Sequence, residues 1–150
     1  LYTKSIGSDF TYSWIEINAL RYWAISKDHV LAAQLYLNSV CGTPPFFSLP
    51  ALGGSNVMRG YFQGRYRDNH LVAAQFEYRQ YFWWRLGFVA FAGAGDVAPE
   101  ITSFYISDIK PTYGLGLRVL FNKKRKINLR IDLGFGKGTS GIYFGMKEAF

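Results

Sequence analysis

The chain has a single cysteine, Cys41, among its 150 residues, so it forms no internal disulfide and has no paired-cysteine metal motif. It also lacks any run of about 18 apolar residues, which excludes a transmembrane helix. That absence does not exclude a transmembrane β-barrel, whose strands are short and alternate in polarity. Charged residues make up 18% of the chain, below the roughly 25% of an average soluble domain.

The residues that are abundant are apolar and aromatic. The chain is 49% hydrophobic and 19% aromatic, which argues against disorder. Its net charge of +7 could suit nucleic acid or anionic lipid, but the basic residues are dispersed apart from "NKKRK" at 122–126. Dispersed charge is not typical of a nucleic-acid-binding stripe, so no nucleic-acid partner is predicted. The basic run is most simply a solvated turn.

Apolar and polar residues alternate strictly in the segments 29–38, 71–84, 113–121 and 127–136. A period of two residues predicts strands whose two faces differ. In 71–84, for example, Val72 and Phe76 share one face while the charged residues lie on the other. The polar faces also carry many small residues, which suits a crowded barrel lumen better than open solvent: Gly93, Gly95, Gly114, Gly116, Gly134 and Gly136.

The breaks in this pattern predict eight antiparallel strands, near 1–6, 10–25, 29–41, 71–84, 86–97, 109–121, 126–137 and 141–150. Most are longer than the roughly 5–6 residues usual in globular proteins and reach the about 9–11 that span a membrane. An even strand number, with short turns alternating with long connections, is typical of bacterial outer-membrane barrels. We predict one all-β domain, residues 1–150: an antiparallel transmembrane β-barrel, either small and closed or the C-terminal half of a larger one. A soluble β-sandwich is the alternative.

The long connection at 43–70 contains the Gly- and Arg-rich stretch "GGSNVMRGYFQGRYRD". This stretch resembles the long loop of the BamA/TamA and bacterial surface antigen superfamily, with Arg59-Gly60-Tyr61 in the place of its VRGF/Y motif. "RLGFVAFAGAGDV" (85–97), "YGLGLRVLFN" (113–122) and residues 127–150 are similar to the strands that follow that loop, in the same order and spacing. The resemblance implies an outer-membrane barrel whose relatives insert or export other proteins.

In that family the motif loop folds back into the lumen and its arginine lies against polar residues of the inner wall. The resemblance therefore implies a lumen position for the loop-motif residues Arg59, Gly60, Tyr61, Gly53 and Gly54, whose glycines would let the backbone pack closely. A buried arginine needs an acceptor because an unpaired buried charge is costly. The alternative for Arg59 is a solvated loop arginine.

The family often has an aspartate on the strand at 91–95, facing this arginine, but Gly93 stands there in this chain. Asp96 falls on the wrong face to replace it. We expect Glu77 to be the acceptor, with Asp132 as second choice. The other inner-wall residues expected beside them are Arg79, Arg118 and Arg130.

The last predicted strand, 141–150, places Ile142, Phe144, Met146 and Phe150 on one apolar face, interrupted by Glu148. Outer-membrane barrels end in such a strand with a terminal aromatic residue, which the assembly machinery reads. We therefore expect Phe144, Met146 and Phe150 to form an assembly signal.

The sequence predicts no enzyme, cofactor or metal site. His29 and His70 have no metal-ligand partners at suitable spacing, no Ser-His-Asp motif is visible, and the Gly-rich stretches precede no helix. The implied function is assistance in outer-membrane protein insertion or secretion. Its expected partners are outer-membrane lipids, client proteins and the barrel-assembly machinery, with self-association also open. The alternatives are a structural or adhesin-like barrel and a soluble basic β-domain.

Overall fold

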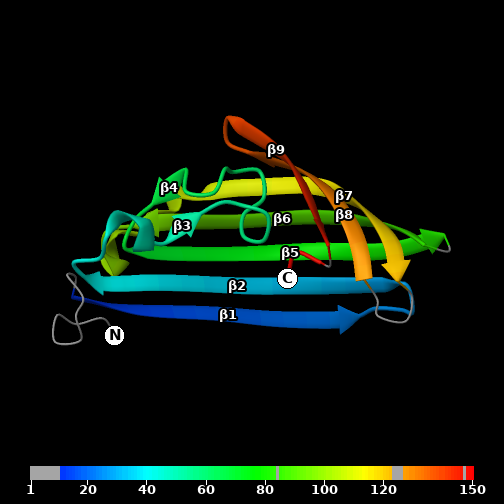
Figure 1. Cartoon of the computed structure of the whole chain (residues 1–150), viewed down its shortest axis with the longest axis horizontal. Coiled ribbons are helices and arrows are strands. Elements are labelled where there is room, and N and C mark those ends of the chain that lie inside the picture. Colours follow the sequence, from blue (N-terminus) through cyan, green and yellow to red (C-terminus); the bar gives the residue numbers. More distant parts are fainter. Residues whose placement is uncertain (1–10, 84, 123–126, 147) are drawn as a thin grey trace.

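The computed structural model describes residues 11–83, 85–122, 127–146 and 148–150. Their main feature is one antiparallel sheet (Figure 1). Its strands, in spatial order, are β1(Tyr12–Ala24), β2(His29–Gly42), β5(His70–Trp83), β6(Leu86–Ala98), β7(Lys110–Asn122), β8(Ile127–Gly136) and β9(Thr139–Met146). The predicted all-β antiparallel fold is confirmed. The strand expected at 1–6 and most of the "NKKRK" run lie outside the described residues.

The sheet is open, so the described residues do not form the small closed barrel that was one of the two expectations. Strands β1 and β9 lie at its two edges and pair only with β2 and β8. A barrel of about eight strands has an interior wide enough only for side chains, and here a long loop lies across the inner face. That loop and a closed ring of seven strands would compete for the same space.

The loop between β2 and β5 crosses one face of the sheet, which we call the inner face (Figure 1). It contains the turn η2(Phe46–Ser48) and a two-stranded ribbon of β3(Ala51–Leu52) and β4(Tyr66–Arg67). The second long connection, between β6 and β7, contains η3(Ile101–Ser103) and η4(Ile106–Asp108).

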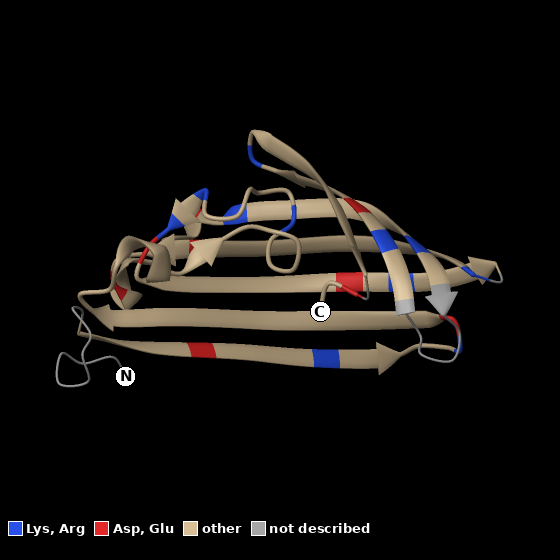
Figure 2. Cartoon of the chain, viewed as in Figure 1, with Lys and Arg blue, Asp and Glu red and all other residues tan. Residues whose placement is uncertain are grey.

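The inner face is polar and buried, whereas the opposite outer face is apolar and exposed. On β5, Glu77 is fully buried while Phe76 beside it is 55% exposed. Figure 2 shows that charged positions of β5, β7 and β8 gather in one part of the sheet, apart from Lys110 at the start of β7, while β2 carries none. The exposed outer-face residues of the last three strands are Tyr113, Leu115, Leu117, Val119, Leu129, Ile131, Leu133, Phe135, Ile142, Phe144 and Met146. This is the reverse of a soluble sheet, which buries its apolar face.

The largest apolar cluster is small and belongs mainly to the loop. Leu52, Met58 and Tyr61 from the loop pack against Leu71 and Ala73 at the start of β5. The inner face of the sheet has few buried apolar side chains of its own. The loop therefore contributes most of those in this cluster. Its packing places the segment around Arg59 over the charged part of the sheet.

Candidate functional site: an arginine-anchored loop on the inner face

Arg59 joins the loop to two strands of the inner face, β5 and β8, which are separated by β6 and β7. Its side chain is fully buried. The guanidinium pairs with Glu77 on β5 and donates from Nη1 to Asp132 Oδ2 on β8 at 2.7 Å. Its Cζ also lies 3.7 Å from the centre of the Phe91 ring on β6, a cation–π contact. The structure therefore brings Arg59 against both carboxylates expected for it, and it is not a solvated loop arginine.

Around this contact lies a buried ion cluster of four arginines and three carboxylates. Asp132 also pairs with Arg118 and has Arg130 Nη1 at 3.6 Å, while Arg79 pairs with Glu77 at 2.6 Å. The third carboxylate, Glu148, receives a hydrogen bond from Arg118. Buried charges are tolerated only when they are paired and hydrogen-bonded, so the cluster depends on its full set of members.

The backbone of the loop motif is held by polar side chains that the sequence did not single out. The Thr112 hydroxyl on β7 donates to the Arg59 carbonyl. The Tyr143 hydroxyl on β9 accepts from the Gly60 N–H at 2.9 Å and donates to the Tyr61 carbonyl at 3.1 Å. The Met58 N–H donates to Gln75 Oε1 at 2.9 Å. One loop motif thus contacts β5, β7 and β9 at once.

Glycines on β8 make room for the motif. A Cβ on Gly134 would lie 2.6 Å from the Gly60 nitrogen, and one on Gly136 would lie 2.5 Å from the Tyr61 ring. Gly60 itself has a φ of +111° and lies directly against the backbone of Phe135. Gly134 therefore lies where the loop backbone meets β8, and Gly136 where the Tyr61 ring does.

The other residues considered from the sequence are two loop glycines, Gly53 and Gly54, and Asp96 on β6. Gly53 and Gly54 both have positive φ and lie where the loop turns, and the Gly54 N–H donates to the Tyr61 carbonyl. Asp96, expected to miss Arg59, pairs with Lys110 instead.

The chain end differs from the prediction of a strand over 141–150. Strand β9 ends at Met146, so Phe144 and Met146 share the exposed outer face but Phe150 does not. Instead, Glu148 is bound by Arg118 and the Phe150 carbonyl accepts a hydrogen bond from Arg79 at 2.8 Å. These contacts draw the segment across the inner face in front of β5 (Figure 1).

Glu148 makes the docking of this segment dependent on pH. Burial alone would raise the pKa of Glu148, but the charge and hydrogen bond of Arg118, with a smaller effect of Arg79, hold it below its ordinary value. A lowered pKa contributes stability that is present at neutral pH and is lost as pH falls through the folded-state value. We expect unfolding in urea to show a loss of stability below about pH 4 that is reduced in Glu148→Gln. Equal pH profiles for the two proteins would contradict this assignment.

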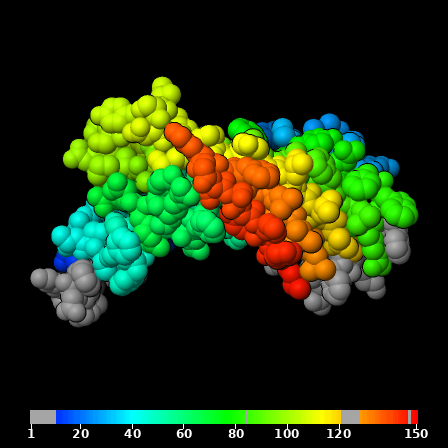
Figure 3. Space-filling model, turned by 90° about the horizontal axis from the view of Figure 1, so that it is seen from above, coloured from blue at the N-terminus to red at the C-terminus, as the bar shows by residue number. Residues whose placement is uncertain are grey.

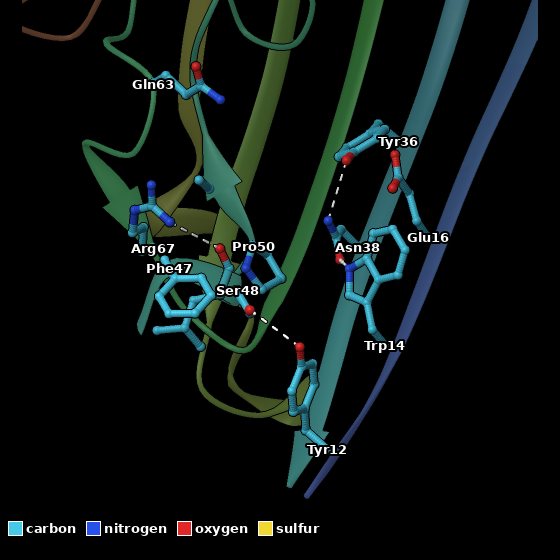
Figure 4. A pocket seen from close by; sticks show the side chains of 12 residues that line it. Tyr12, Trp14, Glu16, Tyr36, Asn38, Phe47, Ser48, Pro50, Gln63 and Arg67 are labelled. Atoms are coloured by element: carbon cyan, nitrogen blue, oxygen red, sulfur yellow. Dashed lines mark hydrogen bonds between the residues drawn. The ribbon is translucent and has the colours of Figure 1, made fainter. Parts of the chain in front are cut away.

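A separate cleft of about 460 Å³ lies between the first arm of the loop and strands β1 and β2, at one edge of the sheet (Figure 4). Trp14 Nε1 donates to Asn38 Oδ1 at 2.7 Å, and the hydroxyls of Tyr12 and Ser48 lie 3.4 Å apart across it. The loop therefore reaches β1 near the start of that strand, and the segment around Arg59 is anchored on strands from β5 to β9.

The site contains ion pairs and hydrogen bonds, and the described residues include no group of three or more potential metal ligands. No helix among them is long and apolar enough to cross a membrane. No family model matches the sequence, and no curated protein matches it.

Proposed function

We propose that this chain forms part of the wall of an outer-membrane β-barrel of the BamA/TamA type, with the loop of residues 43–69 folded back so that its segment around Arg59 lies in the lumen. The outer face would contact lipid and the inner face would line the lumen. Its function would be to assist the insertion or export of other outer-membrane proteins. This requires no covalent chemistry, because the wall and the lumen loop would act by their shape and surface.

The distribution of polarity supports the location. Strands that span a membrane as a barrel alternate between lipid-facing apolar residues and polar residues inside. The exposed row on β7 and the buried charges behind it have this alternation. The long exposed strands would be an aggregation hazard in water, but they suit contact with acyl chains.

The observation that carries the functional proposal is the position of Arg59. The motif by which the sequence resembles the superfamily is the part of the loop that reaches the inner wall, where Arg59 bridges Glu77 and Asp132. A loop held by a buried ion pair on both sides would obstruct the lumen and brace opposite parts of the wall. Both effects are useful in a barrel that handles other chains.

The function is tested by the folding of a second outer-membrane barrel in lipid vesicles that contain this chain. We expect this second barrel, the client, to reach its heat-modifiable, folded form faster in these vesicles than in empty ones. Arg59→Ala should lose most of this acceleration, because the loop loses its anchor. Lys27→Ala, which removes an exposed cation from the turn between β1 and β2, should keep it.

Two results would contradict the proposal. If folded wild-type chain gives no acceleration, the chain does not assist insertion, and a structural or adhesin-like barrel is favoured. If Arg59→Ala remains folded and accelerates the client as well as the wild type does, the anchored loop has no part in the activity. Gel mobility without boiling shows whether each variant is folded.

A further inference from the structure

The second long connection, between β6 and β7, carries apolar side chains that the loop site does not explain. Ile101, Tyr105 and Ile106 are 72%, 62% and 89% exposed. In Figure 3 the yellow-green segment that includes this connection forms a lobe on the side of the molecule away from the cyan part of the lumen loop. Apolar residues on a water-exposed loop are costly, so this lobe is suited to contact with another apolar phase.

Beneath the lobe lies an apolar groove of about 370 Å³. Its floor is the outer face of β5 and β6, and its wall is the connection. The residues that line it are Val72, Ala74, Ala94, Gly95, Asp96, Phe104, Tyr105, Ile106 and Ile109. It therefore opens on the face that we assign to lipid.

A polar cavity of about 680 Å³ adjoins the groove and shares Asp96, Tyr105 and Ile109 with it. Arg65 and Lys137 also line this cavity.

The charges in this cavity leave an excess of cations. Lys110 is paired with Asp96. Asp108 keeps its charge, since its hydrogen bond comes from the neutral Ser107 hydroxyl. The lining residues thus comprise three cations, Arg65, Lys110 and Lys137, and two carboxylates, Asp96 and Asp108. Neither of the two other cations that line the cavity forms an ion pair among the described residues. They would attract a phosphate group.

We propose that the groove and the cavity together bind one lipid whose phosphate headgroup carries a net negative charge. An acyl chain would lie in the groove against Val72 and Ala94, and the phosphate would lie near Arg65 and Lys137. A single site of this kind combines apolar contact with charge complementarity, as lipid-specific pockets do. The inference rests on the proposed membrane location and adds to it a specific lipid site at the rim of the wall.

The test uses the full chain folded in dodecyl maltoside micelles and titrated with fluorescent phosphatidylglycerol, with phosphatidylcholine and inorganic phosphate as comparison probes. We expect tighter binding of phosphatidylglycerol than of either comparison probe. Arg65→Glu/Lys137→Glu should weaken it by at least about tenfold, since each lost cation is worth roughly fivefold. Ala94→Phe, which fills the groove, should also weaken it.

The control is Lys27→Glu, which makes the same kind of charge change in the exposed turn between β1 and β2 and should bind as the wild type does. The proposal is overturned if phosphatidylcholine binds equally well, or if the double variant matches this control. If inorganic phosphate binds as tightly as phosphatidylglycerol does, the acyl chain contributes no affinity, and the proposed role of the groove is wrong. Because the titration is done in micelles, it does not depend on whether the sheet enters a bilayer or assists a client.

Discussion

Asp132→Asn is expected to cost about 3–5 kcal/mol of the free energy of unfolding, measured by urea titration in detergent micelles. Asp132 is fully buried and faces three arginines, Arg59, Arg118 and Arg130. Replacing Asp132 with a neutral asparagine leaves the cluster with four arginines and only two carboxylates. Arg59→Ala should cost less, because Glu77 keeps Arg79 and Asp132 keeps its other partners.

The control for this prediction is Asp28→Asn, at an exposed turn residue, which should change stability by no more than about 0.5 kcal/mol. A second variant tests the mechanism. Arg130 has buried nitrogens, Nε and Nη1, with no hydrogen-bond partner, so adding Arg130→Gln to Asp132→Asn removes a cation that has lost its counter-charge. The double variant should recover part of the lost stability. An Asp132→Asn protein as stable as the control would show that the charge balance of the cluster does not hold the loop.

Gly60→Ala is expected to destabilise the folded chain by more than about 3 kcal/mol, or to release the loop from the inner face. Two costs combine at this position. A positive φ of +111° disfavours any residue with a Cβ, and the added Cβ would lie 2.6 Å from the Phe135 carbonyl carbon, in backbone that cannot move aside. Limited proteolysis within the loop, compared with the wild type, would detect its release.

Gly138 provides the matched control, because it also has a positive φ, +66°, but has nothing within 4 Å of the position of a Cβ. Gly138→Ala should therefore show only the cost of the backbone conformation, of about 1–2 kcal/mol. If both variants lose the same stability, close packing of the loop on β8 is not what Gly60 provides.

The strands could be predicted from the sequence because their alternation is strict. Strands β5, β7 and β8 begin and end within a few residues of the predicted bounds. The polar alternate positions also indicated which residues share the inner face, and so which carboxylates Arg59 could reach. The glycines on that face were a signal for the loop, since Gly134 and Gly136 leave the space that it occupies.

Other features depend on contacts that no local pattern contains. Thr112 and Tyr143 hold the loop motif, but a threonine and a tyrosine on a strand are ordinary strand residues. Glu148 interrupts the apolar row of the last predicted strand, and its pairing with Arg118, which no local pattern contains, holds the segment after Met146 against the inner face. The open sheet could not be told from a closed barrel because closure depends on whether the edge strands β1 and β9 meet.

Whether the outer face of the sheet contacts lipid can be measured directly. Single cysteines at Phe76 and Leu117, in a Cys41→Ser background, would carry an environment-sensitive fluorophore in vesicles, with Lys27→Cys as the control at a turn. Phe76 and Leu117 are 55% and 58% exposed on that face. We expect strong quenching by spin-labelled lipid at both strand positions and weak quenching at the control. Quenching by aqueous iodide at Leu117, with none by lipid, would contradict it.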